Sequence, residues 1–139
     1  MPITIGRTFY MGVDPVMEQN NAVYREQSLL VQELAEKSDC VIVGRSADYI
    51  LRDKDPLRLF IYADIESRME RCRKRAPEQE HFTDKELRRH IQDVDKKRSK
   101  YYQFFTGQTW GDKLNYDLCI NTSGADIEAL VKVIAKLVK

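Results

Sequence analysis

Short apolar runs along this chain predict β-strands. Cys40 to Val43 is four unbroken apolar residues, and Leu57 to Tyr62 and Tyr116 to Ile120 are two further runs of strand-forming composition. A short apolar run is typical of a strand covered on both faces, as in a parallel sheet, although periodicity alone does not distinguish it from buried helix. Ile3 to Ile5 is a fourth, shorter candidate strand.

Apolar residues at helical spacing predict that the segments between and after these runs are helical. We expect an amphipathic helix over Ala22 to Lys37, one helical turn over Ala47 to Leu51, and helices over Ile65 to Ala76, Thr83 to Phe105 and Ile127 to Val138. Strands that alternate with helices predict an α/β layer architecture. The polar residues that follow each strand should then gather at one crevice.

Capping residues indicate where several of these helices begin. Thr83 and Glu86 have the spacing of a capping box before the long helix. Asn20 and Asn21 are candidate caps of the first helix, and Ser123 is a candidate cap of the last one.

Size, charge and cysteine content narrow the class of protein. The 139 residues and net charge of +1 indicate a single domain without the bulk charge that favours nucleic acid or membrane surfaces. No apolar stretch approaches the roughly 18 residues of a membrane span, and the amino-terminal residues lack a signal-peptide pattern. Cys40, Cys72 and Cys119 are odd in number and far apart, which indicates reduced core thiols. His81 and His90 lack partners at the spacing of a structural metal site, so we expect no such site. Together, these features predict a soluble cytoplasmic protein.

Two arginines occupy positions where an anion could bind. Arg45 follows Gly44 directly after a predicted strand, at the edge where α/β sheets bind ligands, although an ordinary surface cation after a turn glycine fits equally well. Arg98 interrupts the apolar stripe of the long helix, so it either reaches water or points at a bound anion. Further cations surround it, and this stretch could close over phosphates as a lid. The cationic run from Arg68 to Arg75 is more typical of a solvated helix surface.

Three segments carry more specific motifs. They read Cys-Val-Ile-Val-Gly-Arg-Ser-Ala-Asp-Tyr-Ile-Leu at 40–51, Asp-Lys-Lys-Arg-Ser-Lys-Tyr-Tyr-Gln-Phe-Phe-Thr-Gly at 95–107, and Trp-Gly-Asp at 110–112 with Tyr-Asp-Leu-Cys-Ile-Asn at 116–121. In combination, over roughly Val16 to the carboxyl terminus, they closely resemble the cytidylate-kinase-like family of P-loop nucleoside monophosphate kinases.

The resemblance implies a fold, a reaction and a set of site residues. The implied fold is a truncated three-layer, parallel-sheet P-loop-kinase-like domain over 1–139 with a helical lid at approximately 66–112. The implied reaction transfers the terminal phosphate of ATP, with Mg²⁺, to CMP or a related nucleotide. The residues implied to act are Asp95, Lys97, Arg98 and Lys100 in catalysis, Arg45, Ser46 and Asp48 at the acceptor, and Gly6, Arg7, Arg68, Thr122 and Ser123 on the ATP side.

The amino-terminal region departs from that family. No G-x-x-x-x-G-K-[ST] motif is present, and Thr8 to Gly12 does not continue the Ile3 to Arg7 segment as a glycine-rich turn. If Ile3 to Ile5 is the central strand, it can lie between the Cys40 and Leu57 strands in a four-stranded sheet. If it is not, a partner chain, such as a second copy, or a local rearrangement has to cover the gap.

Three functions are therefore open. The first is an active nucleotide kinase, and the second is a non-catalytic shortened relative that binds nucleotide or a protein partner. The third is a nucleic-acid binder that uses the arginines at 68–75, 88 and 89. It ranks last because acidic residues share those helices.

Overall fold

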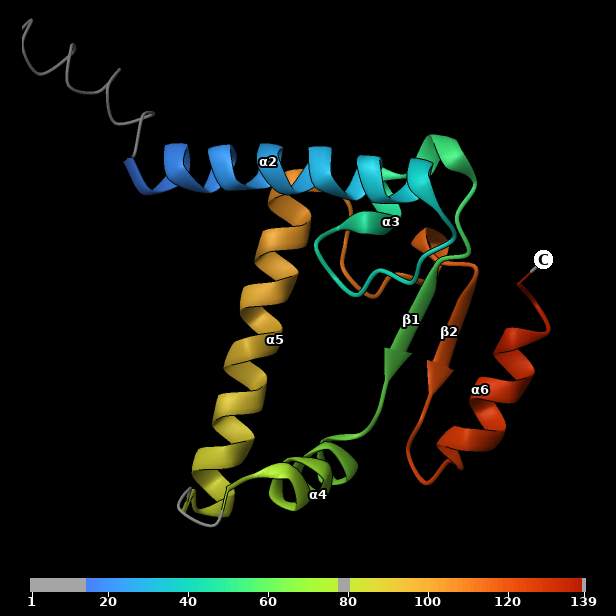
Figure 1. Ribbon diagram of the computed structural model, residues 1–139. Helices are drawn as coiled ribbons and strands as arrows, with labels where there is room; N and C mark the ends of the chain where they lie inside the picture. The colour runs from blue at the N-terminus through green and yellow to red at the C-terminus, as the bar shows by residue number, and fades with distance from the viewer. Residues whose placement is uncertain (1–14, 78–80, 139) are drawn as a thin grey trace, which may run out of the picture. The chain divides into compact units, whose positions relative to one another are not determined.

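The computed structural model describes residues 15–77 and 81–138 (Figure 1). Their contacts divide the chain into two units, one ending at Asp55 and the other beginning at Pro56, and each has its own hydrophobic cluster. Among the described helices, none has the length and apolar content that crossing a bilayer requires. The predictions on Ile3 to Ile5, Gly6 and Arg7 lie outside the described residues.

The first unit is built on one long helix. This helix is α2 (Pro15–Lys37), which is followed by the short α3 (Ala47–Ile50) and the 3₁₀ turn η1 (Arg52–Lys54). The predicted helix is present, but it begins at Pro15, where proline is tolerated because the first N–H groups of a helix have no intrahelical partner. Asn20 and Asn21 lie inside α2, so their predicted role as caps is wrong.

The segment from Cys40 to Val43 does not form the predicted strand. Ile42 packs against the buried cluster of Val31, Ala47 and Leu51, whereas Val41 and Val43 are 94% and 88% exposed. A strand buried in a parallel sheet needs hydrogen-bonded neighbours, and within the described residues the sheet contains only two strands of the second unit. Without a neighbour, only one side of this segment is covered.

The second unit contains a small parallel sheet. Strand β1 (Leu59–Tyr62) pairs with β2 (Leu118–Asn121), so that Leu59 is opposite Leu118 and Tyr62 is opposite Asn121 (Figure 1). Both strands lie within runs that the sequence predicts to be strands. The described chain is thus a mixed helix and strand fold with a parallel sheet, as the α/β prediction requires.

Three helices accompany this sheet. They are α4 (Ile65–Arg75), α5 (Asp84–Thr106) and α6 (Ile127–Ala135), and the turn η2 (Lys113–Asn115) precedes β2. Helices α4 and α5 pack on each other through Met69, Leu87 and Ile91, which are the buried residues of the second cluster. The α4 and α5 pair therefore has a core of its own.

Caps fix the ends of these helices. The Thr83 and Glu86 capping box before α5 is confirmed, and Gly107 ends α5 with a φ of 70°, a left-handed conformation that favours glycine. The cap of α6 is Asp126, so the prediction of Ser123 in that role is wrong. The Ser123 Oγ instead accepts a hydrogen bond from the Asp64 N–H at 2.8 Å.

All three cysteines are free and exposed, so their predicted burial as core thiols is wrong. Cys40 is the first residue of the partly covered segment described above, and Cys119 lies on β2, where only Ile120 is even partly buried. Cys72 lies on α4 outside the buried cluster that joins α4 to α5.

The ion pair between Arg58 and Asp117 lies at the start of both strands, and it should make the stability of the fold sensitive to acid. Asp117 Oδ2 accepts a hydrogen bond from the Arg58 backbone N–H at 2.7 Å, and the guanidinium binds both carboxylate oxygens at 3.2 Å. Hydrogen bonds from Arg58 lower the pKa of Asp117. A carboxyl group with a lowered pKa stabilises the fold above its unfolded pKa and loses that contribution as the pH falls through the folded value.

We expect the melting temperature to fall as the pH drops below about 4. In Asp117→Asn, part of this acid dependence should disappear. Melting curves by circular dichroism between about pH 3 and pH 7 test this. Equal acid dependence in the variant and the parent would contradict a role for the Arg58 and Asp117 pair.

Candidate functional site

An open cleft of about 250 Å³ lies at the carboxyl end of β1, within the second unit. Its lining residues are Phe60, Ile61, Tyr62, Ala63, Arg68, Arg71, Asp95, Arg98, Trp110 and Thr122. They come from β1, α4, α5 and the loops around β2. This is the edge at which α/β sheets bind ligands.

A bidentate ion pair crosses the cleft from α4 to α5. Arg68 Nη1 and Nη2 donate to the two carboxylate oxygens of Asp95 at 2.6 and 2.8 Å, and the two side chains are only 30% and 28% exposed. This parallel geometry is the strong form of an arginine and carboxylate contact. The charges of Arg68 and Asp95 therefore balance each other inside the cleft.

Arg98 adds a positive charge to this cleft that is paired with none of the described residues. It lies three residues after Asp95 on α5 and lines the cleft beside Trp110 and Thr122. Within residues 15–77 and 81–138, its guanidinium has no hydrogen-bond or ion-pair partner. The five N–H donors of a guanidinium match the geometry of phosphate and carboxylate groups, so Arg98 can bind an anion.

The third arginine of the cleft is held by the protein. Arg71 Nη2 donates to the Thr122 carbonyl at 2.5 Å, and Nη1 donates to the Thr122 hydroxyl at 2.9 Å. Thr122 follows β2, is only 3% exposed, and donates from its N–H and its hydroxyl to the Tyr62 carbonyl. The ends of both strands are thereby tied to α4.

Asp64 lies next to these contacts, at the start of α4. It caps α4 by accepting from the Ser67 N–H, and this hydrogen bond is the largest of the effects that lower the pKa of Asp64. Arg71 contributes to the same lowering.

Aromatic rings form one wall of the cleft. Phe60 on β1 lies 5.3 Å from Trp110 edge to face, and 5.0 Å from Tyr116, measured between ring centroids. Gly111 has a φ of 81°, and a Cβ there would lie 3.1 Å from Phe60 Cζ, so glycine allows this approach. Trp110 is partly buried in this wall.

The cleft brings together some of the predicted residues and not others. Arg68, Asp95, Arg98 and Thr122 line it. Lys97 and Lys100 are exposed on α5 outside the lining, and Ser123 is adjacent to Thr122 but also outside it.

Sequence reasoning named four of the ten lining residues as site residues and missed the other six, among them Arg71, Phe60 and Trp110. Arg71 is one helical turn after Arg68, and this spacing could have indicated it. Trp110 belongs to the motif at 110–112, which gave it no role, and Phe60 gave no comparable signal.

The predicted acceptor residues lie in the first unit, on a strained loop. Gly44, Arg45 and Ser46 have φ values of 73°, 59° and 54°, and consecutive left-handed non-glycine residues cost about 1 kcal/mol or more each. Ser46 is 6% exposed and its Oγ has no partner among the described residues, whereas Arg45 is exposed. Asp48 lies on α3 and is partly buried. Strain of this kind is frequent at ligand-binding loops.

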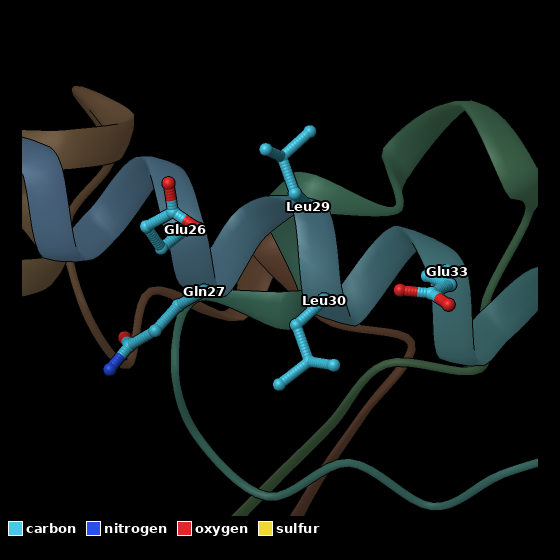
Figure 2. A pocket seen from close by; sticks show the side chains of 5 residues that line it. All are labelled: Glu26, Gln27, Leu29, Leu30 and Glu33. Atoms are coloured by element: carbon cyan, nitrogen blue, oxygen red, sulfur yellow. The ribbon is translucent and has the colours of Figure 1, made fainter.

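A second hollow, of about 380 Å³, runs along α2 (Figure 2). It is lined by Glu26, Gln27, Leu29, Leu30 and Glu33, all from this one helix, and Leu29 and Leu30 point to different sides of it. Its two carboxylates do not suit an anionic ligand, and its polar groups do not converge. The cleft at β1 is therefore the better candidate site.

Metal ligands do not gather in the described part of the chain. Among residues 15–77 and 81–138, no three His, Cys, Asp or Glu side chains lie close enough together to hold a metal ion.

Comparisons with known proteins agree with these observations. Residues 3–124 match the model of the family described as "Cytidylate kinase-like family". The chain is 31% identical over 123 residues to a cytidylate kinase of Archaeoglobus fulgidus, an alignment that covers 88% of this chain and 66% of that protein. A crystal structure of an uncharacterized protein from Eubacterium ventriosum is similar with a TM-score of 0.74 and 30% identity, covering 84% of this chain and 64% of the other.

The chain thus spans just under two thirds of the length of these two relatives. The match to the family model nevertheless covers most of the chain, including the strained loop, the α4 and α5 pair and both strands. On this match, the chain belongs to the cytidylate kinase-like family.

Proposed function

We propose that this protein binds nucleotides and transfers the terminal phosphate of ATP to CMP or a related nucleoside monophosphate. The observation that carries the proposal is Arg98, a guanidinium without a described partner in a cleft with an aromatic wall. A nucleotide has phosphates for the cation and a base for the aromatic rings. The family match and the similarity to a cytidylate kinase support this choice of ligand.

The proposed roles of the cleft residues follow from their contacts. Arg98 binds and stabilises the transferred phosphate, because phosphoryl transfer depends mainly on positioning and on charge stabilisation. Asp95 holds Arg68 in place. Thr122 and Ser123 border the ATP base, and Lys97 and Lys100 add positive charge along the exposed side of α5.

The acceptor is proposed to bind at the loop of the first unit. Arg45 is exposed there and suits the acceptor phosphate, while the buried Ser46 hydroxyl and Asp48 suit its polar groups. Gly6 and Arg7 are proposed on the ATP side. The full proposal is a three-layer P-loop-kinase-like domain over 1–139, in which residues 66–112 form the lid.

MgATP enters this reaction as a substrate. Mg²⁺ usually keeps several waters and is bound by one or two carboxylates together with the phosphates of the nucleotide.

A non-catalytic relative that binds nucleotide is the second candidate. The sequence has no G-x-x-x-x-G-K-[ST] motif, and in P-loop enzymes this loop holds the β- and γ-phosphates. Such a protein would bind the acceptor and little ATP.

Titration of ATP and CMP separately tests nucleotide binding. Trp110 is the single tryptophan of the chain and lines the cleft, so its fluorescence should change as the cleft fills. We expect saturation between about 1 µM and 1 mM, the usual range of substrate affinities. N-acetyltryptophanamide serves as a control for absorption by the nucleotides.

Formation of ADP from ATP and CMP with Mg²⁺ then separates the two candidates. Turnover supports the kinase, whereas CMP binding without turnover at micromolar protein supports the non-catalytic relative. If neither nucleotide binds at millimolar concentration, the proposed function is wrong.

We propose a cytoplasmic location, which the three free, exposed cysteines support because exposed thiols persist in reducing compartments. Nucleotides are the proposed partners, with neither nucleic acid nor membrane. Association into a homodimer stays a prediction that sedimentation can test.

A further inference from the structure

Arg71 differs from the other two arginines of the cleft in what it contacts. Arg68 binds a carboxylate and Arg98 has no partner among the described residues, whereas Nη1 and Nη2 of Arg71 both donate to a single residue, Thr122. The planar guanidinium fork matches the Thr122 carbonyl and hydroxyl at once. The orientation of the Arg71 guanidinium is therefore set by Thr122.

Thr122 is where the two strands and α4 meet. Its N–H and hydroxyl donate to the Tyr62 carbonyl at 2.8 and 3.0 Å, which joins the ends of β1 and β2. The carbonyl of Thr122 also accepts from the Ala125 N–H at 3.2 Å, which shapes the loop before α6. At 3% exposure, Thr122 has little freedom once Arg71 holds its carbonyl and its hydroxyl.

We infer that Arg71 is a positioning residue for the nucleotide site: it fixes the loop at Thr122 and Ser123 and thereby shapes the wall of the cleft that faces the ligand. This inference rests on the proposed function, because the ligand whose affinity it controls is a nucleotide. Its action is through Thr122 and not through its own charge. A lysine at this position keeps the charge but cannot form the two-pronged contact.

Nucleotide affinity in a set of matched variants tests this role. In Arg71→Met we expect ATP affinity to fall about tenfold, the effect of losing a charge-assisted hydrogen bond, and Arg71→Lys should lose most of the same amount. Arg75→Met is the control, because it removes the same charge from the next turn of α4 outside the cleft. It should change the affinity by less than about twofold.

A double-mutant cycle tests whether Arg71 acts through Thr122. Thr122→Val should also weaken ATP binding about tenfold, and Thr122→Ser should restore most of the affinity because it keeps the hydroxyl. If the two residues act together, Arg71→Met combined with Thr122→Val binds no more weakly than the weaker single variant. Losses that multiply to about a hundredfold would overturn the inference. So would wild-type affinity in Arg71→Lys, which would make Arg71 a direct charge contact.

Hydrogen exchange separates this inference from the proposed function, because it needs no nucleotide. In Arg71→Met, the amide protons of Thr122 and Ser123 should exchange about tenfold faster, while those of Leu87 and Ile91 in the α4 and α5 core should not change. If these exchange rates respond and the parent protein binds no nucleotide, the proposed function fails and the role of Arg71 in holding the loop stands. Unchanged exchange at Thr122 and Ser123 would refute the positioning role itself.

Discussion

Replacement of Arg98 by glutamine is expected to lower the rate of phosphoryl transfer from ATP to CMP by about 10³-fold or more. A single arginine that stabilises the transferring phosphoryl group can contribute about 10³ to 10⁵ in rate. Arg98 has the position for this role, since it lines the cleft and has no partner among the described residues, so its charge is available to the ligand. Glutamine keeps hydrogen-bonding capacity on a shorter side chain but removes the charge.

The measurement is the rate of ADP formation at saturating ATP and CMP, together with the affinity for each nucleotide. Because the effect is on the transition state, the rate should fall far more than the affinity. Arg89→Gln is the matched control, since Arg89 is an exposed arginine of the same helix outside the cleft. Equal losses in the two variants would show that α5 acts through its general charge and would contradict a specific role for Arg98.

The helices could be predicted from the sequence because their signals are local. The Thr83 and Glu86 capping box and the glycine at the end of α5 act within one turn of the helix, and both are in place. Pro15 shows the limit of such signals. It indicates a break, but proline is equally suited to the first turn of a helix, and the structure uses it there.

Each predicted strand needs a neighbouring strand to pair with, and the local pattern of apolar residues does not specify that neighbour. Leu57 to Tyr62 and Tyr116 to Ile120 find each other and form β1 and β2, whereas Cys40 to Val43 has the strongest strand pattern and forms no strand. Its apolar composition predicts burial on both faces, yet Val41 and Val43 are exposed because no strand lies beside them within the described residues. The apolar pattern indicates that a segment can form a strand, and the presence of a neighbouring strand decides whether it does.

The candidate site could be predicted only in part, because it also depends on contacts between residues that are far apart in the sequence. The family resemblance and the interrupted stripe of α5 indicated Arg98, and the resemblance implied Asp95 and Thr122. The contact of Arg71 with Thr122 joins residues 51 positions apart, and the packing of Phe60 on Trp110 joins residues 50 positions apart. Such contacts are set by the folded chain, so residue type and spacing do not reveal them.

Replacement of Met69 by alanine is expected to lower the free energy of unfolding by about 2 to 4 kcal/mol. Met69 is 8% exposed and packs with Leu87 and Ile91, so truncation leaves a cavity at the centre of the only buried cluster described for the second unit. This cluster is small, and few neighbouring side chains are available to fill the space. Urea denaturation followed by circular dichroism measures the change.

Two variants show whether packing is the cause. Met69→Leu nearly conserves the volume and should cost less than about 1.5 kcal/mol. Leu114→Ala truncates a side chain that is 80% exposed, and it should change the stability by no more than about 0.5 kcal/mol.

Met69→Ala should also affect the cleft, because α4 carries Arg68 and Arg71 while α5 carries Asp95 and Arg98. If the contact through Met69 holds the two helices at their observed separation, Met69→Ala should also lengthen or break the 2.6 and 2.8 Å contacts between Arg68 and Asp95. Nucleotide affinity would then fall under conditions where the variant is still folded. A destabilised variant with unchanged nucleotide affinity would contradict this coupling, since it would mean that the ion pair alone keeps the arginines of the cleft in place.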